Sequence, residues 1–122
     1  MAGKNVPVVL IPRFTSYVGA GFFYTLPIPV AAYDTLVLDF WHGVINGTPV
    51  VGMNLTLEES NDATQWTATS GTSITRPYPP APGGAQFRHD LTKAWLRVGI
   101  ELMGVDPAVT CWGTGFFELR ER

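Results

Sequence analysis

Cysteine is nearly absent from this chain of 122 residues, and its one example is Cys111. A single cysteine excludes an intrachain disulfide and a zinc site built from four cysteines, so we expect Cys111 to be a buried structural thiol. Charged residues are also scarce, because they make up 15% of the sequence against about 25% in an average soluble domain. The formal net charge of −2 offers no basic field for phosphates, which argues against direct nucleic-acid binding and favours protein partners.

Long apolar runs are missing as well. The longest uncharged window, Phe14 to Tyr33, contains two glycines and two prolines, whereas a membrane helix needs about 20 consistently apolar residues. The apolar run from Val6 to Ile11 is interrupted by Pro7 and is followed by Arg13 without a convincing cleavage region. We therefore expect no membrane association and no secretory signal, with synthesis in the cytoplasm.

Residues that commonly carry catalysis or bind metals are few and scattered. The two histidines, His42 and His89, lie in different segments, and each has a structural explanation. Glu58 and Glu59 point to opposite faces of one predicted strand, at a solvated strand end, so they cannot form the carboxylate pair of a glycosidase. The side-chain oxygens of Asn61 and Asp62 fit a turn better than a calcium site, because calcium needs six or more ligands. The sequence predicts no catalytic residue, no metal, no cofactor and no enzyme activity.

What the sequence does contain is typical of an all-β protein. Thirteen glycines and ten prolines suit many tight turns, and the apolar fraction of 46% is enough for the core of one domain. Apolar residues alternate with polar ones in several segments, which is the pattern of half-buried strands. We predict an antiparallel β-sandwich or jelly roll of about eight strands. Residues 1–14 are expected to form an N-terminal arm or edge strand, and residues 15–122 a single β-sandwich domain.

Three turns are predicted between these strands. The segment from Leu55 to Thr67 alternates, passes through Ser60-Asn61-Asp62 and returns at Trp66, as in a β-hairpin. Asn46-Gly47 is the strongest short hairpin signal, because type I′ turns need positive φ at both central residues. The third turn is predicted at 104–107, between an alternating strand over 96–102 and another that begins near Val109.

Two apolar, proline-stiffened segments lie outside the best strands and are predicted to contact a partner. They are Val6 to Phe14 and Tyr78 to Gly84, the second within a long loop that could equally be a passive crossover. The predicted contact residues are Val6, Val8, Leu10, Ile11, Phe14, Tyr78, Pro79 and Pro80. Asp39 and Arg97 lie on largely apolar strands and are expected to pair as a structural salt bridge, with a role at a subunit contact left open.

Three segments carry a family resemblance: Glu58 to Asp62 followed by Trp66-Thr67, Asp90 to Val98, and Cys111 to Phe117. Together they resemble small virion proteins of tailed bacteriophages, notably the β-rich decoration, or cement, proteins of the capsid. The resemblance covers about half of the chain and transfers no residue-level binding motif. It implies a homo-oligomer, often a trimer, that sits on the outer capsid surface of the virion and ties neighbouring major capsid subunits together.

Two other roles stay open at this point. The turn at 60–67 also resembles discoidin-like and other carbohydrate-binding sandwiches, so the chain is alternatively a carbohydrate-binding or receptor-binding module of a phage tail. In that role exposed Trp41, Tyr78 or Trp112 would stack on sugar rings. A head-tail connector or tail-tube subunit is the third possibility, and it would be distinguished by ring assembly at one vertex.

Overall fold

The computed structural model describes residues 5–69, 74–75 and 83–120 and confirms an all-β antiparallel fold. No helix long and apolar enough to cross a membrane occurs in these ranges. The strands are β1 (Asn5–Val18), β2 (Gly21–Tyr24), β3 (Ile28–Pro29), β4 (Tyr33–His42), β5 (Asn46–Ser60), β6 (Thr67–Ala68), β7 (Ile74–Thr75), β8 (Gly83–Asp90) and β9 (Trp95–Leu119).

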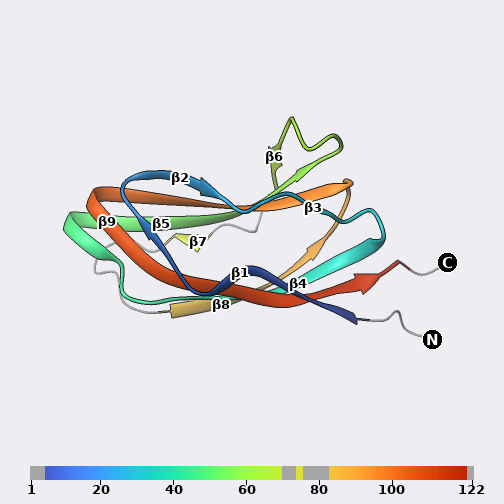
Figure 1. The fold of residues 1–122 in the computed structure, drawn as a ribbon, viewed down its shortest axis with the longest axis horizontal. Coiled ribbons are helices and arrows are strands. Elements are labelled where there is room, and N and C mark those ends of the chain that lie inside the picture. The colour runs from blue at the N-terminus through green and yellow to red at the C-terminus, as the bar shows by residue number, and fades with distance from the viewer. Residues whose placement is uncertain (1–4, 70–73, 76–82, 121–122) are drawn as a thin grey trace.

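One continuous sheet forms both layers of the sandwich, because β9 runs through the two of them (Figure 1). The first half of β9 pairs with β5 on one side and with β2 and β3 on the other. The second half pairs with β4 on one side and with β1 on the other, and β8 extends that layer beyond β4. We call the part with β2, β3 and β5 the first layer and the part with β1, β4 and β8 the second layer.

The turn predicted at 104–107 is wrong, because β9 continues through this segment as a bent strand of 25 residues. Gly104 has a φ of 118° and Asp106 a φ of 51°, so two residues in the left-handed region redirect the strand without ending it. The bend carries β9 from the first layer to the second. The turn-forming residues at 104–107 therefore bend β9 from one layer into the other. Before and after the bend, β9 stays hydrogen-bonded to neighbouring strands.

The hairpin predicted at Asn46-Gly47 is also wrong. β4 pairs with β8 and β9, whereas β5 pairs with β6, β7 and β9, so the chain between them crosses from the second layer to the first. Gly47 does adopt a positive φ, 138°, but it lies inside a register shift between β5 and β9. Asn46 does not have a positive φ, so the dipeptide does not form the type I′ turn that the sequence predicts, and the tertiary pairing decides what this segment connects.

The hairpin predicted over 55–67 is confirmed. Glu58 and Glu59 of β5 pair with Ala68 and Thr67 of β6, and the turn between the strands is organised by Asp62. Its carboxylate accepts hydrogen bonds from the backbone N–H groups of residues 64 and 65 and from a serine hydroxyl, at 2.9–3.0 Å. These hydrogen bonds to the charged form lower the pKa of Asp62 below its ordinary value.

The core lies between the layers and follows the alternation of the strands. In β4, for example, Leu36, Leu38 and Phe40 are buried, as predicted from their spacing. The full set of buried apolar residues is Leu10, Ile11, Val30, Leu36, Leu38, Phe40, Ile45, Met53, Leu55, Leu57, Leu91, Leu96, Val98, Ile100, Leu102, Val109, Cys111 and Phe117. Burial raises the pKa of Cys111 to about 12, as expected for a structural thiol.

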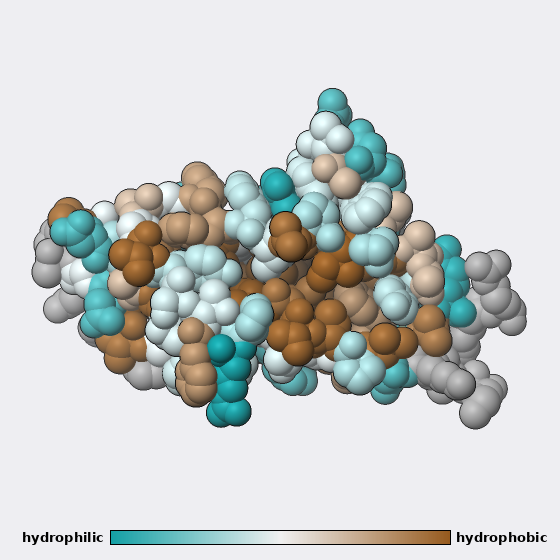
Figure 2. Space-filling model, in the orientation of Figure 1, coloured by the Kyte–Doolittle hydropathy of each residue, from teal (hydrophilic) through white to brown (hydrophobic). Residues whose placement is uncertain are grey.

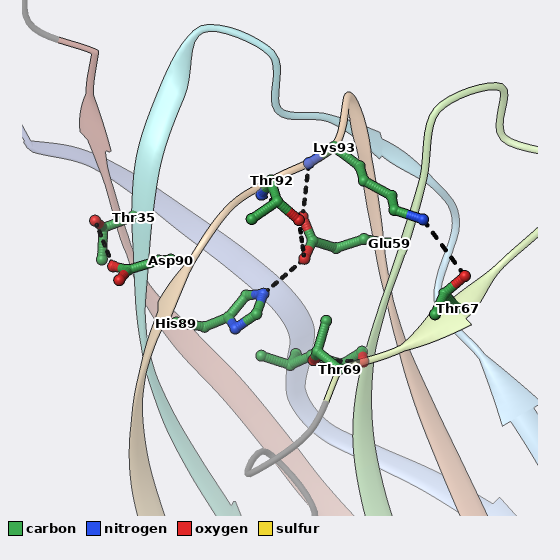
Figure 3. Close-up of polar contacts among 9 residues, drawn as sticks. Thr35, Glu59, Thr67, Thr69, His89, Asp90, Thr92 and Lys93 are labelled. Atoms are coloured by element: carbon green, nitrogen blue, oxygen red, sulfur yellow. Dashed lines mark hydrogen bonds and ion pairs between the residues drawn. The ribbon is translucent and has the colours of Figure 1, made fainter.

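A buried carboxylate fixes one end of the sandwich, where β5 meets the turn between β8 and β9 (Figure 3). Glu59 is 2% exposed, so the expectation of a solvated strand end is wrong for this residue. Its Oε1 accepts the backbone N–H groups of Thr92 and Lys93 at 2.8 and 3.0 Å, and its Oε2 lies 2.9 Å from Nε2 of His89. Three groups from residues 89–93 thus share one carboxylate, which explains why it can be buried.

Candidate partner-binding surface

The N-terminal strand β1 lies at the edge of the second layer, where it pairs with β9 and has no second neighbour among the described residues. The pairing slips between Ile11 and Thr15, where the three β1 residues 12–14 face the single β9 residue Trp112. Phe14 lies in this bulge with a φ of 64°, a conformation that costs free energy for a residue with a side chain. Pro7 and Pro12 lack a backbone N–H, so β1 is a poor template for a further strand.

The structure divides the predicted contact residues of this strand into two groups. Leu10 and Ile11 belong to the core, with 5% and 1% exposure, and cannot contact a partner in the folded chain. Val8 is partly buried against the same core and Val6 is half-buried. Phe14 is 68% exposed. Predicted contacts at 78–80 (Tyr78, Pro79 and Pro80) lie outside the described residues.

An apolar groove runs along the open side of the sandwich, between β1 of the second layer and the β2–β3 segment of the first. We call it the edge groove; its volume is about 370 Å³, and it is lined by Val9, Leu10, Pro12, Tyr17, Thr25, Leu26 and Ile28. Leu26 is 85% exposed and Val9 is 58% exposed, although both are apolar. Figure 2 shows apolar residues gathered in the hollow between these strands, with polar residues around it. Large apolar side chains concentrated in this way mark a site that another surface covers.

Aromatic rings continue this surface over the outer face of the second layer. Phe14 meets Trp112 edge-on with ring centroids 5.6 Å apart, and Trp112 stacks on Trp41 at 4.1 Å. The Arg13 guanidinium lies 5.0 Å from the Trp112 ring centroid. We call these four residues the aromatic cluster. Because the two tryptophans cover each other, their stacked faces are not available as platforms for sugar rings.

The predicted salt bridge between Asp39 and Arg97 does not form. Asp39 lies on the outer face of the second layer and accepts a hydrogen bond from the Gln86 amide at 3.0 Å. Arg97 lies on the outer face of the first layer, where its Nε donates to Glu58 at 2.7 Å. The bend of β9 puts Arg97, in the first half of β9, and Asp39, on β4, into different layers. Sequence patterns within single strands do not show this arrangement.

The remaining candidate residues have structural surroundings. His42 is fully buried and its Nδ1 donates to the Gly43 carbonyl at 2.7 Å, while His89 holds the Glu59 carboxylate. No group of three metal-ligating side chains lies together anywhere in the described ranges. What this side of the molecule offers is exposed apolar area beside the guanidinium of Arg13.

Leu26 is the exposed groove residue that sequence reasoning missed. In the sequence, Phe22, Tyr24, Leu26 and Ile28 alternate with other residues, and this pattern predicts one strand that continues through Leu26. Instead β2 ends at Tyr24 and β3 begins at Ile28, so Leu26 lies in a short connection at the edge of the first layer. Pro27, which cannot donate a ladder hydrogen bond, was the available signal for this interruption.

Comparison with known proteins gives a fold and no family. No family model and no curated protein matches the chain. Among solved structures, a chain in the structure of infectious bursal disease virus, Gx strain, is similar over 98% of this chain with a TM-score of 0.60 and 8% identity. The chain spans 33% of that viral chain.

A second similar structure matches as a whole domain. It is a xylan-binding domain from Paenibacillus barcinonensis, with a TM-score of 0.55 and 7% identity over 99% of this chain and 98% of that one. Dimeric latent PorU from Porphyromonas gingivalis is similar over 98% of this chain and 13% of its own length, with a TM-score of 0.50 and 8% identity. At these identities the likeness concerns the fold alone, which is that of a β-sandwich.

Proposed function

We propose that this chain is a structural virion protein that decorates and stabilises a bacteriophage capsid by contacting major capsid subunits. The observation that carries the proposal is the edge groove, where Leu26 is 85% exposed beside apolar residues of β1. The sequence resemblance to phage decoration proteins points to the same role. In this proposal the protein acts on the outer surface of the virion as a homo-oligomer, such as a trimer, without direct contact to nucleic acid or membrane.

The edge groove and the aromatic cluster supply the energy of this contact. Burying a leucine side chain such as Leu26 contributes about 1.5–3 kcal/mol, and aromatic rings at the centre of an interface are typical sites of large contributions. An interface of standard size buries about 800 Å² on each partner, which is about an eighth of the 6755 Å² surface of this protein. The exposed apolar residues on one side of the sandwich can form the centre of a patch of that size.

The contact is expected to use side chains more than backbone pairing. Pro12 offers no N–H, and the bulge at Phe14 interrupts the free edge of β1. Deletion of residues 1–13 would remove Leu10 and Ile11 from the core, so that truncation cannot separate folding from binding. A surface substitution in the groove is the better test.

The decisive experiment uses capsids prepared without this protein and purified Leu26→Asp protein. We expect at least a tenfold loss of affinity for the capsid, since the apolar contribution of Leu26 is lost and a charge must be desolvated. Val44→Asp is the matched control, because Val44 is 49% exposed and does not line the groove. If circular dichroism shows that both variants are folded and they bind the capsid equally well, the proposed contact is overturned.

Particle images separate the proposal from the alternative roles. Density for this protein across the capsid shell, with Leu26 facing major capsid subunits, supports decoration. A ring at one vertex would assign the chain to the head-tail connector or tail, and density at the tail tip would assign it to receptor binding. Either of these two locations would overturn the capsid proposal.

A further inference from the structure

A second groove lies on the outer face of the first layer, away from the edge groove. It crosses β2, β5 and the first half of β9 and has a volume of about 290 Å³. We call it the outer groove, and its lining residues are Phe22, Tyr24, Asn54, Thr56, Glu58, Gly99 and Glu101. All of these come from the solvent-facing positions of the three strands, because their neighbours Phe23, Leu55, Leu57, Val98 and Ile100 face the core.

Aromatic rings form one wall of the outer groove. Phe22 and Tyr24 are two positions apart on β2, so both stand on the same face, and their rings are parallel within 7° with centroids 6.4 Å apart. Phe22 is 64% exposed and Tyr24 is 45% exposed. The guanidinium of Arg97 covers the Tyr24 ring at 3.8 Å and lies 4.5 Å from the Trp66 ring, which holds Tyr24 in place.

A missing side chain makes the floor of the groove. Gly99 pairs with Tyr24 on one side and with Thr56 on the other. A Cβ atom at Gly99 would lie 3.1 Å from the Tyr24 ring, so a side chain here would push the ring aside. The glycine therefore sets both the depth of the groove and the position of its aromatic wall.

Polar groups form the opposite part of the groove, and each is fixed by a neighbour. The Asn54 amide donates to Glu101 at 3.0 Å, and Glu58 accepts from Arg97 at 2.7 Å. A carboxylate has about four acceptor positions, so both glutamates keep capacity to accept hydrogen bonds from a ligand. Two carboxylates against one arginine make the site acidic on balance, which disfavours phosphates, nucleic acids and acidic sugars.

We propose that the outer groove binds a short stretch of a neutral oligosaccharide. The apolar C–H face of a sugar ring would lie on the exposed ring of Phe22, and its hydroxyl groups would donate to Glu101 and Glu58. A hydroxyl-rich ring matches a site that places aromatic faces beside carboxylates and an amide, because it has apolar faces and hydrogen-bond donors at its rim. A purely apolar protein segment would cover the remaining acceptor positions of these two carboxylates without supplying a hydrogen-bond donor.

This inference stands apart from the capsid proposal. The edge groove lies between the two layers, whereas the outer groove lies on the outer face of the first layer, and the two share no lining residue. A decorating protein could therefore contact the shell through the first surface and present the second to a polysaccharide. Failure of either proposal leaves the other unaffected.

The test is a glycan array, probed with the full chain, that carries neutral and acidic oligosaccharides, followed by titration calorimetry with the strongest neutral binder. We expect Phe22→Ala to weaken binding at least tenfold, since the ring supplies the apolar contact. Phe14→Ala is the matched control, because Phe14 is similarly exposed, at 68%, and lies in the second layer. Neither substitution removes a core residue, and unchanged urea midpoints verify that both variants fold.

A second pair of variants tests the polar part of the groove. Glu101→Ala is expected to weaken the same binding about tenfold, because it removes the acceptor for the sugar hydroxyls. Glu118→Ala is its control, since Glu118 pairs with Arg88 on the second layer. Absence of any neutral ligand on the array, a preference for acidic glycans or a peptide, or equal losses in variants and controls would each overturn the assignment.

Discussion

Replacing Glu59 by alanine tests whether one buried carboxylate holds the end of the sandwich together. The side chain of Glu59 is 2% exposed, and its two oxygens accept from the backbone N–H groups of Thr92 and Lys93 and from His89. Alanine removes the acceptor but leaves these donors in a site that water reaches poorly. The turn between β8 and β9 then loses its attachment to β5 (Figure 3).

The expected cost follows from the donors that are left without a partner. Each buried donor without an acceptor costs about 1–3 kcal/mol, and here two backbone N–H groups and the His89 ring lose their acceptor. We therefore expect Glu59→Ala to lower the free energy of unfolding by about 3–5 kcal/mol. Because a domain of this size has a total of about 5–15 kcal/mol, the variant should be close to the limit of folding.

Glu59→Gln separates hydrogen bonding from charge. Both backbone N–H groups donate to Oε1, which the glutamine carbonyl oxygen replaces, so this variant should lose only about 1–2 kcal/mol. Urea unfolding followed by tryptophan fluorescence measures both values. Glu118→Ala is the control; its ion pair with Arg88 lies on the outer face of the second layer, is much more exposed and should contribute about 1 kcal/mol or less. A loss for Glu59→Ala no larger than that of the control would refute this reasoning.

Three further predictions concern single positions. Gly115→Ala should lower the free energy of unfolding by about 3 kcal/mol or more, because the added Cβ would collide with the Val37 carbonyl. At Gly113 the nearest atom to an added Cβ is a side-chain methyl 3.4 Å away, so Gly113→Ala should lower it by less than about 1 kcal/mol. Urea unfolding measures both values. Cys111, with its pKa raised to about 12, should resist iodoacetamide at pH 8 until urea unfolds the chain; stoichiometric labelling of the folded protein would contradict this. Asp62 has a lowered pKa, so its contribution to stability is present above its ordinary pKa of 3.8 and is lost as the pH falls through the folded value. In Asp62→Ala, the free energy of unfolding should therefore fall less steeply below about pH 4 than in the unsubstituted protein. The same pH dependence in both proteins would contradict the hydrogen bonds seen in the turn.

Local patterns predicted which side of each strand faces the core. The alternation in β4 and in the first half of β9 gave the buried residues correctly, and the turn at 60–65 was visible because Asp62 satisfies backbone donors within its own segment. Burial of Cys111 was predicted because a single cysteine forms no intrachain disulfide and is usually a buried thiol. These features depend on neighbours that are close in sequence, so a single sequence contains them.

Features that depend on pairing between distant strands were not accessible in this way. Nothing near Asn46-Gly47 shows that β4 and β5 belong to different layers, and nothing near Asp106 shows that β9 bends and continues. The predicted partner of Arg97 was wrong for the same reason, since the choice between Asp39 and Glu58 is made by the layer in which each lies.

The sequence by itself determined an all-β domain, the inward and outward faces of its strands and the absence of a disulfide, because alternation, turn chemistry and cysteine count act locally. The tertiary structure alone decided that Leu10 and Ile11 are core residues, that Leu26 is exposed beside them and that Phe22 and Tyr24 share a groove with Glu58 and Glu101. The physical reason is the bend of β9, which closes one sheet into two layers and so fixes which surfaces are buried and which stay open to a partner.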